Sequence, residues 1–142
     1  LIHQPSFSMF NRWIQDQGLV DAMINEGVGI IPFSILSQGL LTTKYLNAVP
    51  TDSRAGNKDV PFLNENNITK EYLAKVVKLN ELAEKRGQTL AEMAVSWTCQ
   101  SRGITTVLLG VSKLSQLESN LKAINHLEFS EAELMEIEKI TR

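Results

Sequence analysis

Apolar residues follow two patterns along the chain, and each pattern predicts a different kind of element. Nearly continuous apolar or β-branched runs occupy residues 27–33 and 103–110. Such runs are typical of strands that are covered on both faces, as in a parallel sheet. Residues 1–4 fit the end of a third strand. The first pattern therefore favours a sheet of buried, parallel strands.

Helical spacing of apolar residues is the second pattern. It predicts helices over residues 13–25 and 71–86, and Gly87 is a natural C-terminal stop for the second helix. Residues from about 43 to 69 form a long loop rich in Pro, Asn and Asp, a length that is usually functional or mobile. Strands separated by helical crossovers predict an α/β protein with parallel pairing.

Capping residues mark where three further helices begin. Thr89 with Glu92 and Ser130 with Glu133 have the spacing of capping boxes, in which each side chain bonds the other residue's backbone. Ser112 is expected to cap the helix that follows it. The inner face of that helix is expected to carry the apolar residues Leu114, Leu117, Leu121 and Ile124.

Composition excludes several function classes. The net charge of −2 gives no basic excess for a broad nucleic-acid surface, and no apolar run approaches the ~18–20 residues of a membrane span. His3 and His126 have no ligand-spaced partners, so no metal site is expected. Cys99 is the only cysteine, which fits a reducing compartment. No signal peptide is visible, and a cytoplasmic location is expected.

Two junctions that follow predicted strands have the residues expected of a ligand site. Ligands of parallel α/β folds bind at the carboxyl ends of strands. Residues 33–39 place an aromatic ring, hydroxyls, an amide and a glycine there. Residues 110–113 place a glycine and a lysine before a helix N-terminus, which favours an anion. A plain strand-to-helix turn and a capped helix with a solvated lysine remain open as alternatives.

Three linked motifs together resemble a known family. They are HQPSFSMFNR at residues 3–12, GIIPFSILSQGLLTTKY at 29–45 and VLLGVSKLSQLESN at 107–120. In order and spacing they resemble the C-terminal half of the aldo-keto reductases, in the branch of glyceraldehyde-3-phosphate reductases and potassium-channel β-subunits. The resemblance implies the C-terminal part of a (β/α)8 TIM barrel, with the predicted strands as the sixth to eighth. Residues 1–142 are then expected to be a fragment of a barrel, which needs ~250 residues.

The resemblance also implies a site for NADPH or NADP. Gln4 is expected to bond the nicotinamide carboxamide, and Phe33 is expected to stack on the nicotinamide ring. The pyrophosphate is expected to lie against Ser34, Leu36, Ser37, Gln38 and Gly39, with Lys44 and Arg54 closing over it from the long loop at about 43–69. The adenosine end is expected to contact Gly110, Ser112, Lys113, Gln116 and Asn120, with Ser112 and Lys113 facing the 2′-phosphate.

The family's chemistry is hydride transfer from the cofactor to an aldehyde or ketone, giving an alcohol. No residue of this chain matches the family's catalytic motifs, so the cofactor-binding part of an enzyme is expected, inactive by itself. The alternatives are a non-catalytic NADPH-binding or regulatory module and a structural interaction domain. Expected partners are the nicotinamide cofactor, a small carbonyl substrate in the full-length protein and a second copy of the chain, because strand edges are left open.

Overall fold

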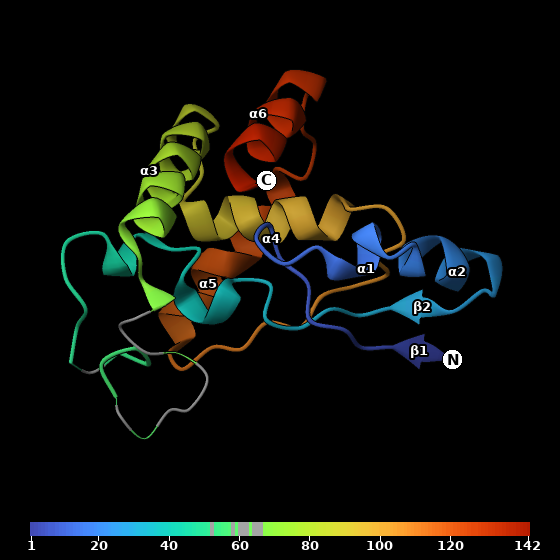
Figure 1. Ribbon diagram of the computed structural model, residues 1–142, viewed down its shortest axis with the longest axis horizontal. Coiled ribbons are helices and arrows are strands. Elements are labelled where there is room, and N and C mark those ends of the chain that lie inside the picture. The colour runs from blue at the N-terminus through green and yellow to red at the C-terminus, as the bar shows by residue number, and fades with distance from the viewer. Residues whose placement is uncertain (52, 58, 60–62, 64–66) are drawn as a thin grey trace.

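The computed structural model describes residues 1–51, 53–57, 59, 63 and 67–142. The strands and short helices of the first part are β1 (Ile2–His3), α1 (Trp13–Asp16), α2 (Leu19–Asn25), β2 (Gly29–Ile30) and the 3-10 helices η1 (Ser37–Gly39) and η2 (Thr43–Tyr45). The second part contains α3 (Lys70–Lys85), α4 (Leu90–Gln100), α5 (Leu114–Leu121), the 3-10 helix η4 (Lys122–Asn125) and α6 (Glu131–Thr141). In Figure 1, α4 crosses the middle of the molecule, with α3 and α6 on one side and the two strands on the other.

Helix α4 is central because its sequence is apolar nearly all round. Every residue from Glu92 to Thr98 is buried. Two of its buried hydroxyls bond within the helix: the Ser96 hydroxyl donates to the Glu92 carbonyl at 2.9 Å and the Thr98 hydroxyl to the Ala94 carbonyl at 2.8 Å. Buried hydroxyls satisfied in this way cost little. The main core gathers around this helix and draws residues from β2, α1, α2, α3 and α6.

The sheet is parallel, as predicted, but its strands are shorter than the sequence pattern suggested. In β1 and β2, Ile2 pairs with Gly29 and His3 with Ile30. The predicted strand over 103–110 contributes only a single parallel bridge, Ile104 to Ile30. Proline explains part of the interruption, because Pro32 has no N–H to extend a ladder. Its carbonyl still accepts a hydrogen bond from the Leu108 N–H at 2.9 Å.

The helix predicted over 13–25 is broken into α1 and α2. Gly18 sits at the break with φ 70°, a left-handed conformation that glycine adopts without steric cost. Helix α3 agrees with its predicted bounds to within one residue at each end. Both capping boxes are confirmed, Thr89 with Glu92 and Ser130 with Glu133.

Two expectations about α5 are wrong. Ser112 does not cap the helix: the N-cap is Lys113, with no side-chain cap hydrogen bond. The predicted inner face is also largely exposed, since Leu114 is 70%, Leu121 47% and Ile124 63% accessible. The buried side of α5 holds Asn120 instead. Periodicity identified an apolar stripe, and that stripe faces solvent.

Candidate functional site

The three parallel segments end at the same edge of the fold. The Phe33 N–H donates to the Pro5 carbonyl at 3.0 Å, and the Phe7 N–H donates to the Phe33 carbonyl at 3.2 Å. On the other side of the second segment lies the Leu108 N–H, bonded to Pro32. These hydrogen bonds therefore hold three segments side by side: the one after β1, the one after β2 and the one that leads into residues 110–113. In Figure 1 the chain leaves both strands toward the side where α5 and the long loop lie.

The loop after β2 holds an unusual run of backbone conformations. Ser34, Ser37 and Gln38 have φ values of 56°, 48° and 59°, which non-glycine residues rarely adopt. Gly39, at φ 95°, continues the run. Short turn bonds hold it, among them Ser37 N–H to the Ser34 carbonyl at 2.8 Å. Backbone strain of ~1–3 kcal/mol per residue persists where the surroundings over-determine it, often at functional sites.

Two contacts hold the loop after β2 against the rest of the fold, one by apolar packing and one between two serine hydroxyls. Ile35 is 2% exposed and packs with Val95 of α4 and Ala123 of η4. The Ser37 hydroxyl lies 2.9 Å from that of Ser8, which belongs to the loop after β1. Ser8 is itself 1% exposed. This buried contact joins the two loops, and Ser8 was not among the predicted site residues although it lies in the first motif.

Aromatic and amide groups at the strand ends face outward. Phe33 is 41% exposed, a large open fraction for a phenylalanine next to a buried strand. Gln4 is exposed as well. Leu36, Ser37, Gln38 and Gly39 are half-buried. An accessible ring beside polar groups can stack on a flat heterocycle.

The second junction forms a polar turn ahead of α5. The Ser112 N–H and hydroxyl both donate to Gln116 Oε1, at 3.0 and 3.2 Å. Lys113 and Gly110 are exposed, and a Cβ added to Gly110 would meet nothing within 4 Å. Asn120 differs from the rest because it is 5% exposed. The residues expected to contact the adenosine end of the cofactor therefore divide into an open turn at the surface and one buried amide, that of Asn120.

The described part of the long loop has a small core of its own. Tyr45, Ala55 and Leu63 are buried together. Lys44 is exposed, with its ammonium 5.9 Å from the Tyr45 ring centroid. Arg54 is exposed beside this cluster. The described residues of this loop thus pack on one another and place Lys44 and Arg54 at the surface. Residues 52, 58, 60–62 and 64–66 of the predicted loop lie outside the described residues.

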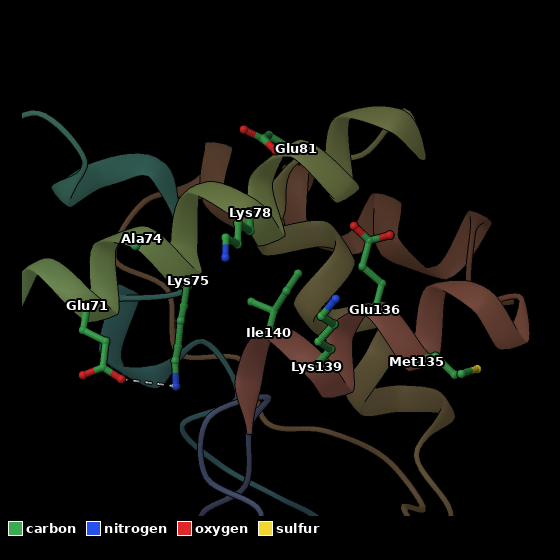
Figure 2. A pocket seen from close by; sticks show the side chains of 9 residues that line it. All are labelled: Glu71, Ala74, Lys75, Lys78, Glu81, Met135, Glu136, Lys139 and Ile140. Atoms are coloured by element: carbon green, nitrogen blue, oxygen red, sulfur yellow. Dashed lines mark ion pairs between the residues drawn. The ribbon is translucent and has the colours of Figure 1, made fainter.

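A groove lies elsewhere, between α3 and α6. Figure 2 shows Lys78 on α3 and Glu136 and Lys139 on α6 along it, with Ile140 at its floor. Its charges are mixed, and Lys75 pairs with Glu71 at 3.8 Å. This groove shares no residue with the two junctions. Among the described residues there is also no cluster of three or more His, Cys, Asp or Glu side chains that could hold a metal ion.

Comparisons with known proteins agree with the three motifs. The chain is 48% identical over 142 residues to an L-glyceraldehyde 3-phosphate reductase of Escherichia coli K12, covering 98% of this chain and 41% of that protein. It is 31% identical to a probable voltage-gated potassium channel subunit beta of Arabidopsis thaliana, covering 88% of this chain and 38% of the relative. The chain therefore spans less than half the length of these relatives.

Solved structures show the same fold relationship. A glycerol dehydrogenase from Gluconobacter oxydans superposes with a TM-score of 0.76 at 26% identity, covering 98% of this chain and 41% of the other. An aldo-keto reductase from Bacillus halodurans, in its holo form, gives a TM-score of 0.73 at 17% identity, covering 100% and 43%. The fold is thus that of part of an aldo-keto reductase barrel. No helix in the described part of the chain is long and apolar enough to cross a membrane. The aldo/keto reductase family model matches residues 1–142, and the chain belongs to that family.

Proposed function

We propose that this chain is the cofactor-binding part of an NADPH-dependent aldo-keto reductase that converts aldehydes or ketones into alcohols. The observation that carries the proposal is the left-handed backbone at Ser34, Ser37 and Gln38, at the carboxyl end of β2. Leu36, at φ −94° and ψ 15°, is followed by left-handed Ser37. A turn in which a left-handed residue follows one with negative φ offers backbone N–H groups to a phosphate. The Ser37 N–H, which bonds the Ser34 carbonyl, is not one of these groups.

The residues at this edge fit a dinucleotide phosphate. The 41% exposed ring of Phe33 is placed to stack on the nicotinamide, with Gln4 exposed on the neighbouring segment for its carboxamide. The 34–39 loop receives the pyrophosphate, and Lys44 and Arg54 of the long loop add positive charge. Lys113, with the α5 N-terminus behind it, is placed for the 2′-phosphate. In this assignment the three segments are the sixth, seventh and eighth strands of the barrel.

NADPH, when bound, supplies the hydride. The residues named above bind and orient it, and none within residues 1–142 is assigned a catalytic role. In this proposal, the acid that protonates the carbonyl oxygen is a residue of the full-length protein outside residues 1–142. Small aldehydes are the first substrates to test, because two relatives at 48% identity are named L-glyceraldehyde 3-phosphate reductases.

Fluorescence titration with NADPH and NADH tests the proposal. Lys113→Glu reverses the charge beside the expected 2′-phosphate and should weaken NADPH binding about tenfold or more, because charge-assisted contacts are strong. NADH binding should change little. Lys122→Glu is the matched control, since Lys122 follows the other end of α5, about 13–14 Å from Lys113 along the axis. Equal responses of the two nucleotides to Lys113→Glu would refute the 2′-phosphate assignment.

The second candidate is a module that binds NADPH without turnover and associates with another protein chain. Large apolar side chains are exposed along the first and third segments, including Ile2 at 66% and Leu108 at 43%. Open strand edges with apolar side chains favour association. Light scattering of the purified protein should then show an oligomer. NADPH binding without carbonyl reduction by the full-length protein would favour this candidate over the enzyme.

A further inference from the structure

Glu92 is a buried carboxylate in the first turn of α4, where it is 8% exposed. One of its oxygens, Oε2, accepts the Thr89 N–H at 2.9 Å and so completes the capping box of the helix. A glutamine completes such a box equally well, and burying a negative charge is costly unless donors meet it. Capping alone therefore does not account for a carboxylate at this position.

The second carboxylate oxygen of Glu92 bonds another helix. Ser119 of α5 donates its hydroxyl to Oε1 at 3.0 Å, across 27 residues of sequence. A carboxylate can accept on both oxygens at once, and a hydrogen bond to an ionised acceptor is stronger than one between neutral groups. The carboxylate thus caps α4 with one oxygen and ties the start of that helix to α5 with the other.

Helix α5 depends on polar contacts because few of its side chains are buried. The structure describes all of Leu114–Leu121, and Asn120 is the only buried residue among them. Leu114 and Leu121 face solvent, so the apolar stripe of the helix does not hold it in place. The helix nevertheless lies beside α4 (Figure 1). The bond from Ser119 is therefore one of the contacts that fix its orientation.

Ser119 stands among the residues assigned to the adenosine end of the cofactor. Gln116 lies three residues before it, on the same side of the helix, and Asn120 is the next residue. Lys113 is the N-cap of the same helix. A bond that limits the rotation of α5 at Ser119 consequently limits where all three of these side chains point.

We propose that Glu92 and Ser119 are positioning residues: their hydrogen bond holds α5 in the orientation that presents its adenosine-site residues to the cofactor. The inference rests on the proposed function for the identity of that cofactor. Neither side chain is assigned a contact with the nucleotide. Both act through the helix, so removing either one should weaken binding by the same route.

Fluorescence titration of the full-length protein with NADPH tests this role. Glu92→Ala and Ser119→Ala each remove the bond and should raise the Kd for NADPH about three- to tenfold. The double variant should bind little worse than either single variant, because both changes remove one and the same interaction. An unchanged Kd in either single variant, or losses that multiply in the double variant, overturns the proposal.

Thr89→Ala is the matched control for the capping box. It removes the hydroxyl that accepts the Glu92 N–H, and it leaves the bond from Glu92 to Ser119 in place. We expect a lower melting temperature, as in Glu92→Ala, with the Kd for NADPH unchanged. A rise in Kd as large as that of Glu92→Ala would mean that the stability of α4, and not the bond to Ser119, sets the affinity, and would overturn the proposal.

Hydrogen exchange separates a failure of this inference from a failure of the proposed function, because it needs no nucleotide. In the free full-length protein, Ser119→Ala should speed the exchange of the backbone amides of α5 and leave those of α6 unchanged. Unchanged exchange in α5 overturns the positioning role even where NADPH binds. Faster exchange in α5, together with a parent protein that does not bind NADPH, refutes the proposed function, and the cofactor role of the bond fails with it.

Discussion

Arg12 joins the loop after β1 to the C-terminal helix, and replacing it by methionine tests how the fold is held together. Its side chain is 7% exposed. Nε donates to the Met9 carbonyl at 3.1 Å, Nη2 donates to the Thr141 hydroxyl at 2.7 Å, and Nη1 pairs with Glu138. The guanidinium also lies 4.7 Å from the centroid of the Trp97 ring. Methionine retains most of the aliphatic volume and removes every one of these contacts.

The expected loss can be worked from these contacts. A hydrogen bond to a charged group contributes about 1.5–3 kcal/mol net, and a buried carbonyl such as that of Met9 left without a partner costs about 1–3 kcal/mol. The cation–π contact with Trp97 adds about 0.5–1 kcal/mol. Glu138 contributes only ~0–1 kcal/mol, because its side chain is 52% exposed and regains water. These contributions overlap, so we expect a total of about 2–4 kcal/mol.

Urea unfolding followed by far-ultraviolet circular dichroism at pH 7 measures this loss. For a chain of this size, it corresponds to a fall in melting temperature of about 5–15 °C. Arg142→Met is the matched control, because Arg142 pairs with Asp16 and Glu138 but is 47% exposed. The control should change stability little. A loss below about 1 kcal/mol in Arg12→Met would show that water replaces these contacts and that the reasoning from burial is wrong.

Three other predictions follow from the same structure. Phe33→Ala should weaken NADPH binding about two- to tenfold in fluorescence titrations, in line with aromatic pair energies, and unchanged binding would contradict stacking. Thr89→Ala should lower the free energy of unfolding by about 1 kcal/mol in urea, because the capping box is lost. Partial burial raises the pKa values of Glu133 and Glu138, but hydrogen bonds and nearby arginines outweigh it and lower both below the ordinary 4.5. Their contribution to the free energy of unfolding is therefore present above pH 4.5 and is lost as pH falls through the lowered pKa values. In urea unfolding at pH 6 and pH 3, Glu133→Gln should show a smaller fall in the free energy of unfolding than the parent chain.

Local signals in the sequence were sufficient for the starts of α4 and α6, although not for that of α5. Thr89 and Glu92 satisfy each other's backbone across three residues, so no distant part of the chain affects the prediction. The same is true of Ser130 and Glu133. The end of α3 likewise depends on one residue, Gly87, which has φ 68°. Features formed by neighbours in sequence are predictable because their energy depends on those neighbours alone.

Features that depend on distant partners were not predictable in the same way. The run over 103–110 has the composition of a strand, yet its pairing depends on the segment beside it, where Pro32 offers a carbonyl and no N–H. The apolar stripe of α5 was found at the expected spacing, but periodicity does not say which surface covers a stripe. Leu114, at 70% exposure, shows that the stripe faces solvent in this structure.

The candidate site has some features that the sequence predicts and others that depend on distant parts of the chain. The positions of the two junctions were predictable, because strand ends in parallel folds meet at one edge. The left-handed conformations of Ser34, Ser37 and Gln38 were not, since neither serine nor glutamine signals them. Strain of this kind persists only when remote contacts enforce it. Here the enforcing contacts are the burial of Ile35 against α4 and the hydroxyl of Ser8, more than two dozen residues away in sequence. The shape of the loop is therefore a property of the packed fold, and substitutions far from the loop in sequence should alter cofactor affinity wherever they loosen those contacts.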